Sequence, residues 1–369
     1  MKLAEISAVD AAAKTVTSTD GETWSGDALV LAAGSQPNFF GTSGAPEYSF
    51  PLYSLDNATN LRSRILGLLE QVDRNPRLIE RGALTFVIVG GGPTGVEVAG
   101  AIADMIDVTV PAEYHDFDPG DARIYLLDRG DALLKPFSDK AHAYVAKVLT
   151  SRNVQLRLGT VVEEVGPGHA RFSDGAVVPT RCVIWGGGIS AARVAADCGL
   201  AQGRGGRIDA QPDLTYAGTP GVYVVGDIAN ISGPDGEPLP QLGSVALQSG
   251  VTAADNILAE FDGKARRDFA YKDKGIMAMI GRGAAIAEVG KNHHEVHGQL
   301  AHMAWLGVHA SLMTGTRDKI EAIIDWGWDR FSKTGGPHVL DRGDAADINW
   351  DDDPAVASAG TPASTPSSS

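Results

Sequence analysis

The sequence predicts an α/β fold built around a dinucleotide-binding unit, and three observations point to it. Short apolar runs, typical of buried strands, end in glycine at several places along the chain. One run, Phe86 to Val89, leads directly into a G-x-G-x-x-G sequence and then into a helical pattern. Glycine supplies 45 of the 369 residues, about 12% against a usual ~7%, which is typical of folds with many tight turns.

The composition excludes several classes of protein. The chain is long enough for two or three domains. Its net charge of −15 argues against a nucleic-acid binder, which usually carries a basic surface. Cys182 and Cys198 form no C-x-x-C pair, which excludes a redox dithiol and fits a reducing cytoplasm. The amino terminus has no apolar signal-peptide region, and no run of about 18 apolar residues predicts a membrane span.

The expected elements follow in order along the chain. Apolar alternation and helical spacing predict a strand–turn–strand at 1–20, strands at 29–33, 86–89, 123–128, 182–185 and 222–225, and short strands within 154–178. They also predict helices at 57–80, 93–105, 139–151 and 242–260, two strands within 268–290, and two helical stretches within 298–332.

The glycine-rich loop has a specific physical rationale. Gly90 permits a tight turn, Gly92 lets the backbone approach a pyrophosphate, and Gly95 lets the helix pack closely on the strand. The free N–H groups at the start of the helix would then face the phosphates. Asp128 ends the next core strand and would accept hydrogen bonds from a ribose, which favours NAD(H); the following Arg129 keeps a 2′-phosphate open as an alternative.

Two further segments extend this pattern. Leu29 to Ala33 leads into Gly34-Ser35, and Val222 to Val225 leads into Gly226-Asp227. Flanking a glycine-rich loop in this order, they resemble the FAD- and NAD-dependent flavoproteins of the pyridine nucleotide-disulfide oxidoreductase superfamily. The resemblance implies an NAD domain inserted in a split FAD domain, with Asp227 on the flavin ribityl chain and Gly34, Gly226 and Gly188 also lining the cofactors.

Within that superfamily the chain is most similar to type II NADH dehydrogenases, the single-subunit NADH:quinone oxidoreductases. The segments that carry this similarity are Leu31 to Gly41, Val87 to Glu97, Val183 to Gly188, Asp227 to Ala229, Tyr271 to Arg282 and Trp305 to His309. The similarity implies that NADH passes a hydride to FAD and that a quinone-type acceptor collects the electrons.

Three residues are candidates for the chemistry at the acceptor. Glu97, in the first turn of the helix after the loop, matches a family glutamate that handles protons or quinone; a carboxylate favoured by the helix dipole is the alternative. Lys274 matches a family lysine near the flavin, with a solvated surface charge as the alternative. Gln248 matches a glutamine of the family's quinone-pocket segment, although Ser244 and Ser249 depart from that segment.

The sequence also departs from the family at its beginning. Members start with their own G-x-G-x-x-G loop for the FAD pyrophosphate, and we expect this chain to lack that first βαβ unit. A fragment, a misassigned start and a degenerate copy all remain open. The corresponding alternatives for function are another NADH–flavin reductase and a non-catalytic remnant that binds NAD(H) or a partner.

The resemblance implies five segments. Residues 1–82 would form the first part of the FAD domain, 83–205 the NAD(H) domain and 206–267 the second part of the FAD domain. Residues 268–332 would form carboxyl-terminal strands and amphipathic helices, and 333–369 a disordered acidic and Ser/Pro/Ala-rich tail.

The last predicted helix carries an apolar stripe and an acidic row. The acidic row is Glu321, Asp325 and Asp329, and the stripe is Ile320, Ile323, Ile324, Trp328 and Phe331. The stripe favours weak peripheral membrane association, at the inner face of the cell membrane, whereas packing on the domain or in a homodimer is the alternative. Five histidines between 293 and 309 lack the carboxylate or cysteine partners of a good site, so we expect no metal.

Overall fold

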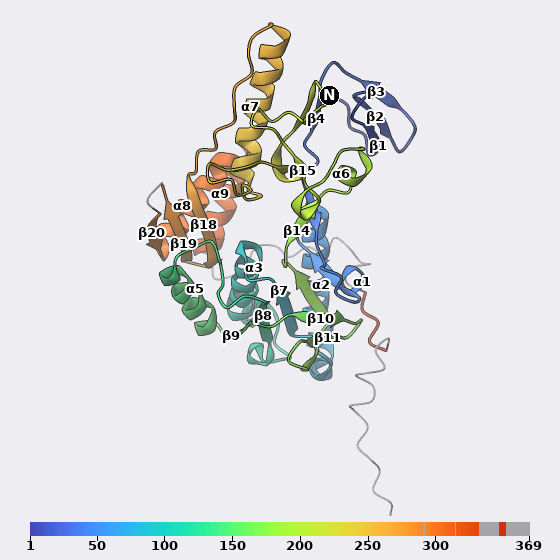
Figure 1. Ribbon diagram of the computed structural model, residues 1–369. Coiled ribbons are helices and arrows are strands. Elements are labelled where there is room, and N and C mark those ends of the chain that lie inside the picture. The colour runs from blue at the N-terminus through green and yellow to red at the C-terminus, as the bar shows by residue number, and fades with distance from the viewer. Residues whose placement is uncertain (291–292, 314, 332–346, 352–369) are drawn as a thin grey trace, which may run out of the picture. The chain divides into compact units, whose positions relative to one another are not determined.

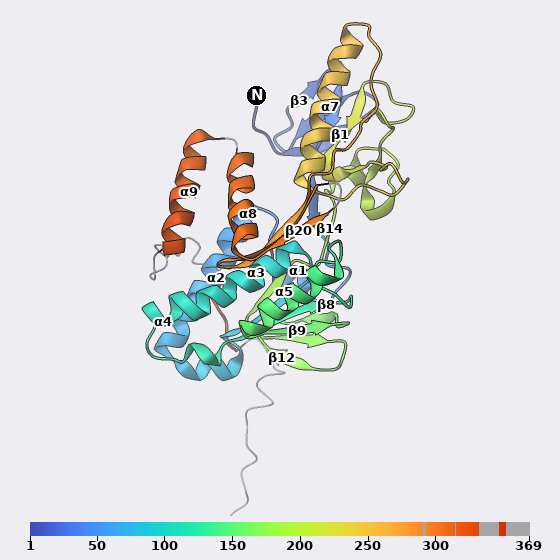
Figure 2. The ribbon, with the colours of Figure 1, turned by 90° about the vertical axis from the view of Figure 1, so that its left-hand side faces the viewer.

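The computed structural model describes residues 1–290, 293–313, 315–331 and 347–351 (Figures 1 and 2). Two compact units divide the chain. Unit 1 contains residues 1–38 and 188–273, and unit 2 contains residues 39–187 and the chain from 274 onward.

A five-stranded parallel sheet forms the centre of unit 2. Its strand order is β6-β13-β7-β8-β9, and every neighbouring pair is parallel. The strands are β6 (Ser49–Pro51), β7 (Thr85–Val89), β8 (Arg123–Asp128), β9 (Val154–Leu158) and β13 (Cys182–Trp185). Because all the strands run the same way, their carboxyl ends meet at one edge, where α/β proteins place their ligands.

Both faces of this sheet are buried, and alternation along the strands decides what each face meets. Phe86 and Ile88 point into the main core with the apolar faces of three helices, whereas Val87 points into a separate cluster on the other face. The helices of the main core are α2 (Leu55–Arg74), α3 (Pro93–Asp104) and α5 (Asp139–Ser151). The other face is covered by the antiparallel sheet β10 (Val162–Val165), β11 (His169–Phe172) and β12 (Val177–Pro179).

The remaining elements of unit 2 are short helical turns, a second antiparallel sheet and two helices. Short elements are α1 (Ala45–Tyr48), the 3₁₀ turns Pro76–Arg81 and Pro119–Asp121, a π-helical turn Met105–Thr109 and α4 (Val110–Glu113). An antiparallel sheet of β18 (Gly275–Gly281), β19 (Ala284–Val289) and β20 (His294–His297) lies against α3, where Gly100 meets the backbone of Ile280. The helices α8 (Gln299–Leu312) and α9 (Thr316–Phe331) follow as neighbours (Figure 2).

Unit 1 is built from short paired strands and one long helix. The parallel pair β4 (Leu29–Leu31) and β16 (Val222–Val224) joins its two chain segments, and its helix is α7 (Gly243–Phe261). The other elements are β1 (Ile6–Asp10), β2 (Thr15–Ser18), β3 (Thr23–Ser25), β5 (Ser35–Pro37), β14 (Ile189–Ala191), α6 (Val194–Asp197), the 3₁₀ turns Arg204–Gly206 and Gly226–Ile228, β15 (Ile208–Asp209) and β17 (Ala229–Asn230).

The α/β class predicted from the sequence is confirmed, but the packing units differ from the predicted segments. Residues 39–82, predicted as part of the first segment of the FAD domain, belong to unit 2, because β6 pairs with β13 and α2 buries Leu68 and Leu69 in the main core. Residues 188–205, expected in the NAD domain, belong to unit 1. What each segment binds stays a prediction.

The carboxyl-terminal tail also differs from expectation over one stretch. Residues 332–346 and 352–369 lie outside the described part, so the predicted disorder is not addressed there. Residues 347–351 are described, and Ile348 and Trp350 pack against the main core. A tail rich in aspartate was not expected to pack. Its composition does not reveal that the indole of Trp350 has a complementary surface elsewhere in the chain.

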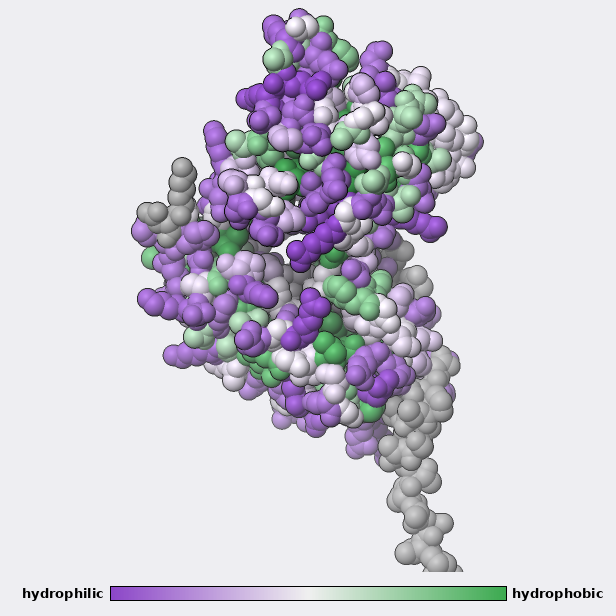
Figure 3. Space-filling model, in the orientation of Figure 1, coloured by the Kyte–Doolittle hydropathy of each residue, from purple (hydrophilic) through white to green (hydrophobic). Residues whose placement is uncertain are grey.

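Polar and charged side chains predominate on the face shown in Figure 3, with apolar side chains in small, scattered patches. Among the described residues, no helix is long and apolar enough to cross a bilayer.

Candidate active site

The glycine-rich loop connects the carboxyl end of β7 to the start of α3. Gly90 has a φ of 106°, and an added Cβ there would overlap the backbone of Gly186. An added Cβ at Gly95 would overlap the carbonyl oxygen of Gly90. At Gly92, by contrast, an added Cβ would meet no atom within 4 Å. Two of the glycines are therefore required by packing, whereas Gly92 leaves open space at the start of the helix.

Asp128 lies at this loop, as the sequence predicts. Its Oδ2 accepts a hydrogen bond from the Gly91 N–H at 2.6 Å, and its Oδ1 accepts one from the Gly130 N–H at 2.6 Å. Each oxygen retains acceptor capacity beyond its backbone bond. The side chain is thus fixed at the edge of the sheet with room for a hydroxyl donor.

A cavity of about 560 Å³ opens at this edge. Gly90, Gly91, Gly92 and Asp128 line it together with Arg129, whose guanidinium lies over the ring of Phe40. Its wall also contains two residues that the sequence analysis did not single out, Trp185 and Lys135. Gly187 lines the cavity, whereas the predicted Gly188 belongs to unit 1 and has its carbonyl bonded to the Asn38 N–H.

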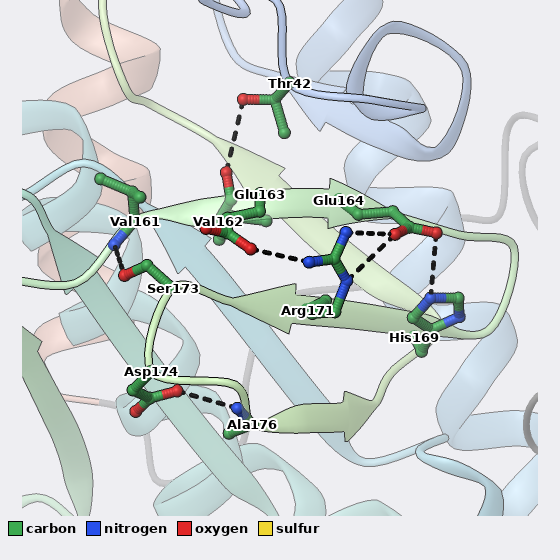
Figure 4. Close-up of polar contacts among 10 residues, drawn as sticks. All are labelled: Thr42, Val161, Val162, Glu163, Glu164, His169, Arg171, Ser173, Asp174 and Ala176. Carbon is green, nitrogen blue, oxygen red and sulfur yellow. Dashed lines mark hydrogen bonds and ion pairs between the residues drawn. The ribbon is translucent and has the colours of Figure 1, made fainter.

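The segment before β10 lines one side of this cavity, and its polar contacts are drawn in Figure 4. The Val161 N–H donates to the Ser173 hydroxyl at 3.1 Å, and the Thr42 hydroxyl donates to the Val162 carbonyl at 3.4 Å. On the same small sheet, Arg171 pairs with Glu163 at 2.7 Å and Glu164 at 2.6 Å. These contacts fix the residues of this cavity wall to the antiparallel sheet β10–β12.

Glu97 lies one turn into α3 and faces the sheet β18–β19 and α8. Its Oε1 accepts two hydrogen bonds, from the Met279 N–H at 3.0 Å and from the Trp305 indole N–H at 3.1 Å. Its Oε2 bonds to none of the residues that the structure describes. Burial raises the pKa of Glu97 above its ordinary value of 4.5; the Met279 N–H, nearby His309 and the Trp305 indole oppose the rise.

His309 lies on α8, one turn after Trp305. Its ring stacks on that of Trp305, with centroids 3.7 Å apart, and its Nδ1 lies 2.8 Å from the Trp305 carbonyl. Because a carbonyl only accepts, Nδ1 is the donor of this hydrogen bond. The sequence offered a signal for this arrangement in the i, i+4 spacing of Trp305 and His309.

Lys274 and Gln248 lie in different units. Lys274 is exposed in unit 2, and its side chain makes no contact with Glu97 among the described residues. Gln248, on α7 of unit 1, exchanges two hydrogen bonds with the backbone of Lys272, at 3.0 and 3.1 Å. The glutamine amide is thus engaged in holding the segment after α7.

A second cofactor-like turn lies in unit 1. Gly34 and Gly226 have φ of 72° and 69°, and each follows one strand of the β4–β16 pair. The Ser35 hydroxyl donates to Asp227 Oδ2 at 3.1 Å, so the two turns meet. Arg207, 8% exposed, has its pKa lowered by burial, and Asp227 partly opposes this. An added Cβ at Gly34 would meet no atom within 4 Å, which leaves space for a ligand.

A glycine loop on a parallel sheet and a Gly-Asp turn in a second unit together define the class of two-site dinucleotide flavoproteins. Residues 1–250 match the pyridine nucleotide-disulphide oxidoreductase family. The chain belongs to this family and, within it, to the type II NADH:quinone oxidoreductases. The resemblance recognised in the sequence is confirmed.

Two curated relatives come from Mycobacterium tuberculosis. The chain is 35% identical to type II NADH:quinone oxidoreductase Ndh over 312 residues, which are 81% of this chain and 66% of the relative. It is 33% identical to NdhA over 349 residues, 88% of this chain and 71% of that relative. The chain therefore spans roughly two thirds of their length.

Solved structures show the same fold. NDH2 of Plasmodium falciparum, solved with NADH, has a TM-score of 0.79 at 16% identity and covers 91% of this chain and 84% of its own. The sulfide:quinone oxidoreductase of Aquifex aeolicus has a TM-score of 0.65 at 15% identity, with 90% and 79% covered.

Proposed function

We propose that this protein is an FAD-dependent NADH dehydrogenase that passes electrons from NADH through the flavin to a quinone-type acceptor. The observation that carries the proposal is the glycine-lined cavity at the carboxyl edge of the sheet, with Asp128 fixed beside it. The curated relatives, named as NADH:quinone oxidoreductases, support the same activity.

NADH would bind in the cavity of unit 2. The open space at Gly92 would admit the pyrophosphate to the amides of the first turn of α3. Asp128 would accept from the ribose hydroxyls and repel a 2′-phosphate, which favours NADH over NADPH. Residues Gly34, Ser35, Gly226 and Asp227 of unit 1 would hold FAD, which supplies the hydride-accepting chemistry when bound.

Glu97 would supply a proton at the acceptor. Burial favours its neutral carboxyl, and the two N–H groups on Oε1 leave Oε2 as the oxygen that carries the proton. Lys274 and Gln248 would assist at the acceptor, as the family resemblance implies.

Two finer proposals concern the surroundings of the protein. Ile320, Ile323 and Ile324 of α9 are each more than half exposed and would bind the inner face of the cell membrane weakly.

An exposed apolar stripe on α7 would form the contact between two copies of the chain in a homodimer. It contains Leu247, Val251, Leu258 and Phe261. Light scattering on Leu258→Glu tests the dimer: the variant should be monomeric under conditions where the unaltered chain is dimeric.

Steady-state NADH oxidation with a short-chain quinone tests the main proposal. With FAD added, quinone should be reduced at the rate at which NADH is consumed, and Asp128→Ala should raise the KM for NADH at least tenfold. The kcat/KM for NADPH should rise relative to that for NADH in this variant. A flavin-loaded chain that consumes NADH but leaves quinone oxidised would overturn the proposal.

A further inference from the structure

The five described residues of the tail, 347–351, pack beside a cleft in unit 2 away from the nucleotide cavity. This tail segment lies at the amino-terminal end of β13, whereas Gly187, after the carboxyl end of β13, lines the nucleotide cavity. The cleft has a volume of about 410 Å³, and Asp347, Ile348 and Asn349 form part of its lining.

Trp350 is the most firmly held residue of the tail segment. Its indole N–H donates to Gln71 Oε1 on α2 at 2.8 Å. The guanidinium groups of Arg81 and Arg181 lie 5.6 and 5.1 Å from the centre of its ring. Arg181 also donates to the Trp350 carbonyl at 3.3 Å. A tryptophan with its N–H bonded and two cations near its ring is a typical anchor of a binding interface.

Carboxylates on both sides of Trp350 in the sequence lie near arginine side chains. Arg81 pairs with Asp351 at 3.7 Å. Burial lowers the pKa of Arg64, and Asp347 opposes this effect electrostatically. Arg181 is only 5% exposed. Arg64 and Arg181 therefore line the cleft, and Arg81 lies at the other end of the tail segment, beside Trp350 and Asp351. The tail segment brings a carboxylate on each side of the indole.

The cleft also contains buried polar atoms to which the tail segment makes no hydrogen bond. Arg64 Nε and Asn60 Oδ1 are buried and make no hydrogen bond to any residue that the structure describes. Both residues line the cleft. A buried group without a partner costs free energy, so the empty cleft beside the tail segment favours a further polar group there.

We propose that Arg64, Arg81, Arg181 and Gln71 form a binding site for a short acidic peptide that carries a tryptophan, and that residues 347–351 of the same chain bind there. The partner chemistry is an indole between carboxylates. Because the segment is tethered, its high effective concentration keeps the site occupied.

Two truncations and one peptide test this site. The first truncation ends at Asp353 and retains Trp350; the second ends at Leu340 and removes the tail segment. A fluorescent peptide of residues 341–353 should bind the shorter chain and should bind the chain ending at Asp353 at least tenfold more weakly. Binding should weaken as salt rises, and the peptide with Trp350→Ala should bind at least tenfold more weakly.

Matched substitutions in the shorter chain distinguish a built site from general charge attraction. Arg81→Leu should weaken peptide binding at least fivefold. Arg77→Leu removes the same charge from the same 3₁₀ turn, away from the tail segment, and should change binding less than twofold. Equal losses from both variants would overturn the proposal, as would equal peptide binding by both truncations.

If the shorter chain fails to fold, judged by circular dichroism, the peptide is titrated into the full-length Trp350→Ala chain instead. It should bind the peptide at least tenfold more tightly than the unaltered chain, with NADH affinity unchanged in both. Equal peptide affinities would overturn the proposal.

Discussion

Gly92 and Gly95 are separated by only two residues, yet their physical roles differ. An added Cβ at Gly95 would overlap the Gly90 carbonyl oxygen, whereas one at Gly92 would meet no atom within 4 Å. Gly95 keeps helix and strand in contact, and Gly92 keeps a space open for a ligand.

The pair gives a matched test of the loop. Gly95→Ala should lower the free energy of unfolding by about 3 kcal/mol or more, because backbone would have to move. Gly92→Ala should change it by less than about 1 kcal/mol but weaken NADH binding at least tenfold. Urea denaturation and fluorescence titration with NADH measure the two effects. Undiminished NADH binding by Gly92→Ala would count against the pyrophosphate assignment.

Glu97 makes stability depend on pH in a defined direction. Burial raises its pKa in the folded state, so the folded chain holds a proton that the unfolded chain releases. The stability associated with the neutral carboxyl is complete below the unfolded value near 4.5 and is lost as the pH rises through the folded value.

Glu97→Gln removes this titration but retains an oxygen for Met279 and Trp305. Its free energy of unfolding should match that of the unaltered chain below pH 4.5 and exceed it at pH 8, as measured by denaturation across this range. Quinone reduction should fall at least tenfold. The exposed Glu80→Gln serves as a control and should leave both properties unchanged. Parallel stability curves for Glu97→Gln and the unaltered chain would exclude a raised pKa.

At the scale of elements, α9 combines an apolar stripe with acids, and the structure leaves the described part of that stripe uncovered. Ile320, Ile323 and Ile324 are 54%, 57% and 62% exposed. Trp326 instead lies near Trp305 of α8, with ring centroids 6.1 Å apart. The predicted stripe residues Trp328 and Phe331 have side chains outside the described part.

Vesicle flotation tests what covers this stripe. The chain should bind neutral vesicles weakly and with little dependence on salt, because burial of apolar side chains drives it at about 1.5–3 kcal/mol for each one fully buried. Replacing all three isoleucines with serine should abolish flotation, whereas Glu321→Gln should have little effect on neutral vesicles. Flotation that survives the triple replacement would place the membrane contact elsewhere.

At the scale of the whole molecule, the chain crosses between its two units three times, after residues 38, 187 and 273. Each unit carries a candidate cofactor turn with space beside a glycine that follows a strand, at Gly92 in unit 2 and Gly34 in unit 1. The two cofactors would therefore order different segments of the chain.

Hydrogen exchange distinguishes the two assignments. NADH should slow exchange in peptides covering 88–96 and 126–135 of unit 2, and FAD in peptides covering 32–37 and 222–230 of unit 1, because a ligand that binds only the folded state suppresses local opening. Protection of the unit 1 peptides by NADH alone, with no protection near Gly92, would contradict the assignment of binding sites to units.

The sequence by itself determined the α/β class, the glycine loop and the position of Asp128, because these depend on local patterns of strand, turn and helix. It also predicted α5 and β13 at their observed bounds. Tertiary structure alone decided that residues 39–82 join the parallel sheet of unit 2, that Trp305 and Met279 hold Glu97, and that Trp350 packs beside Arg81 and Arg181. Each of these contacts joins residues far apart in the chain, and no local periodicity records which distant surface a strand edge, an indole or a buried carboxyl will meet.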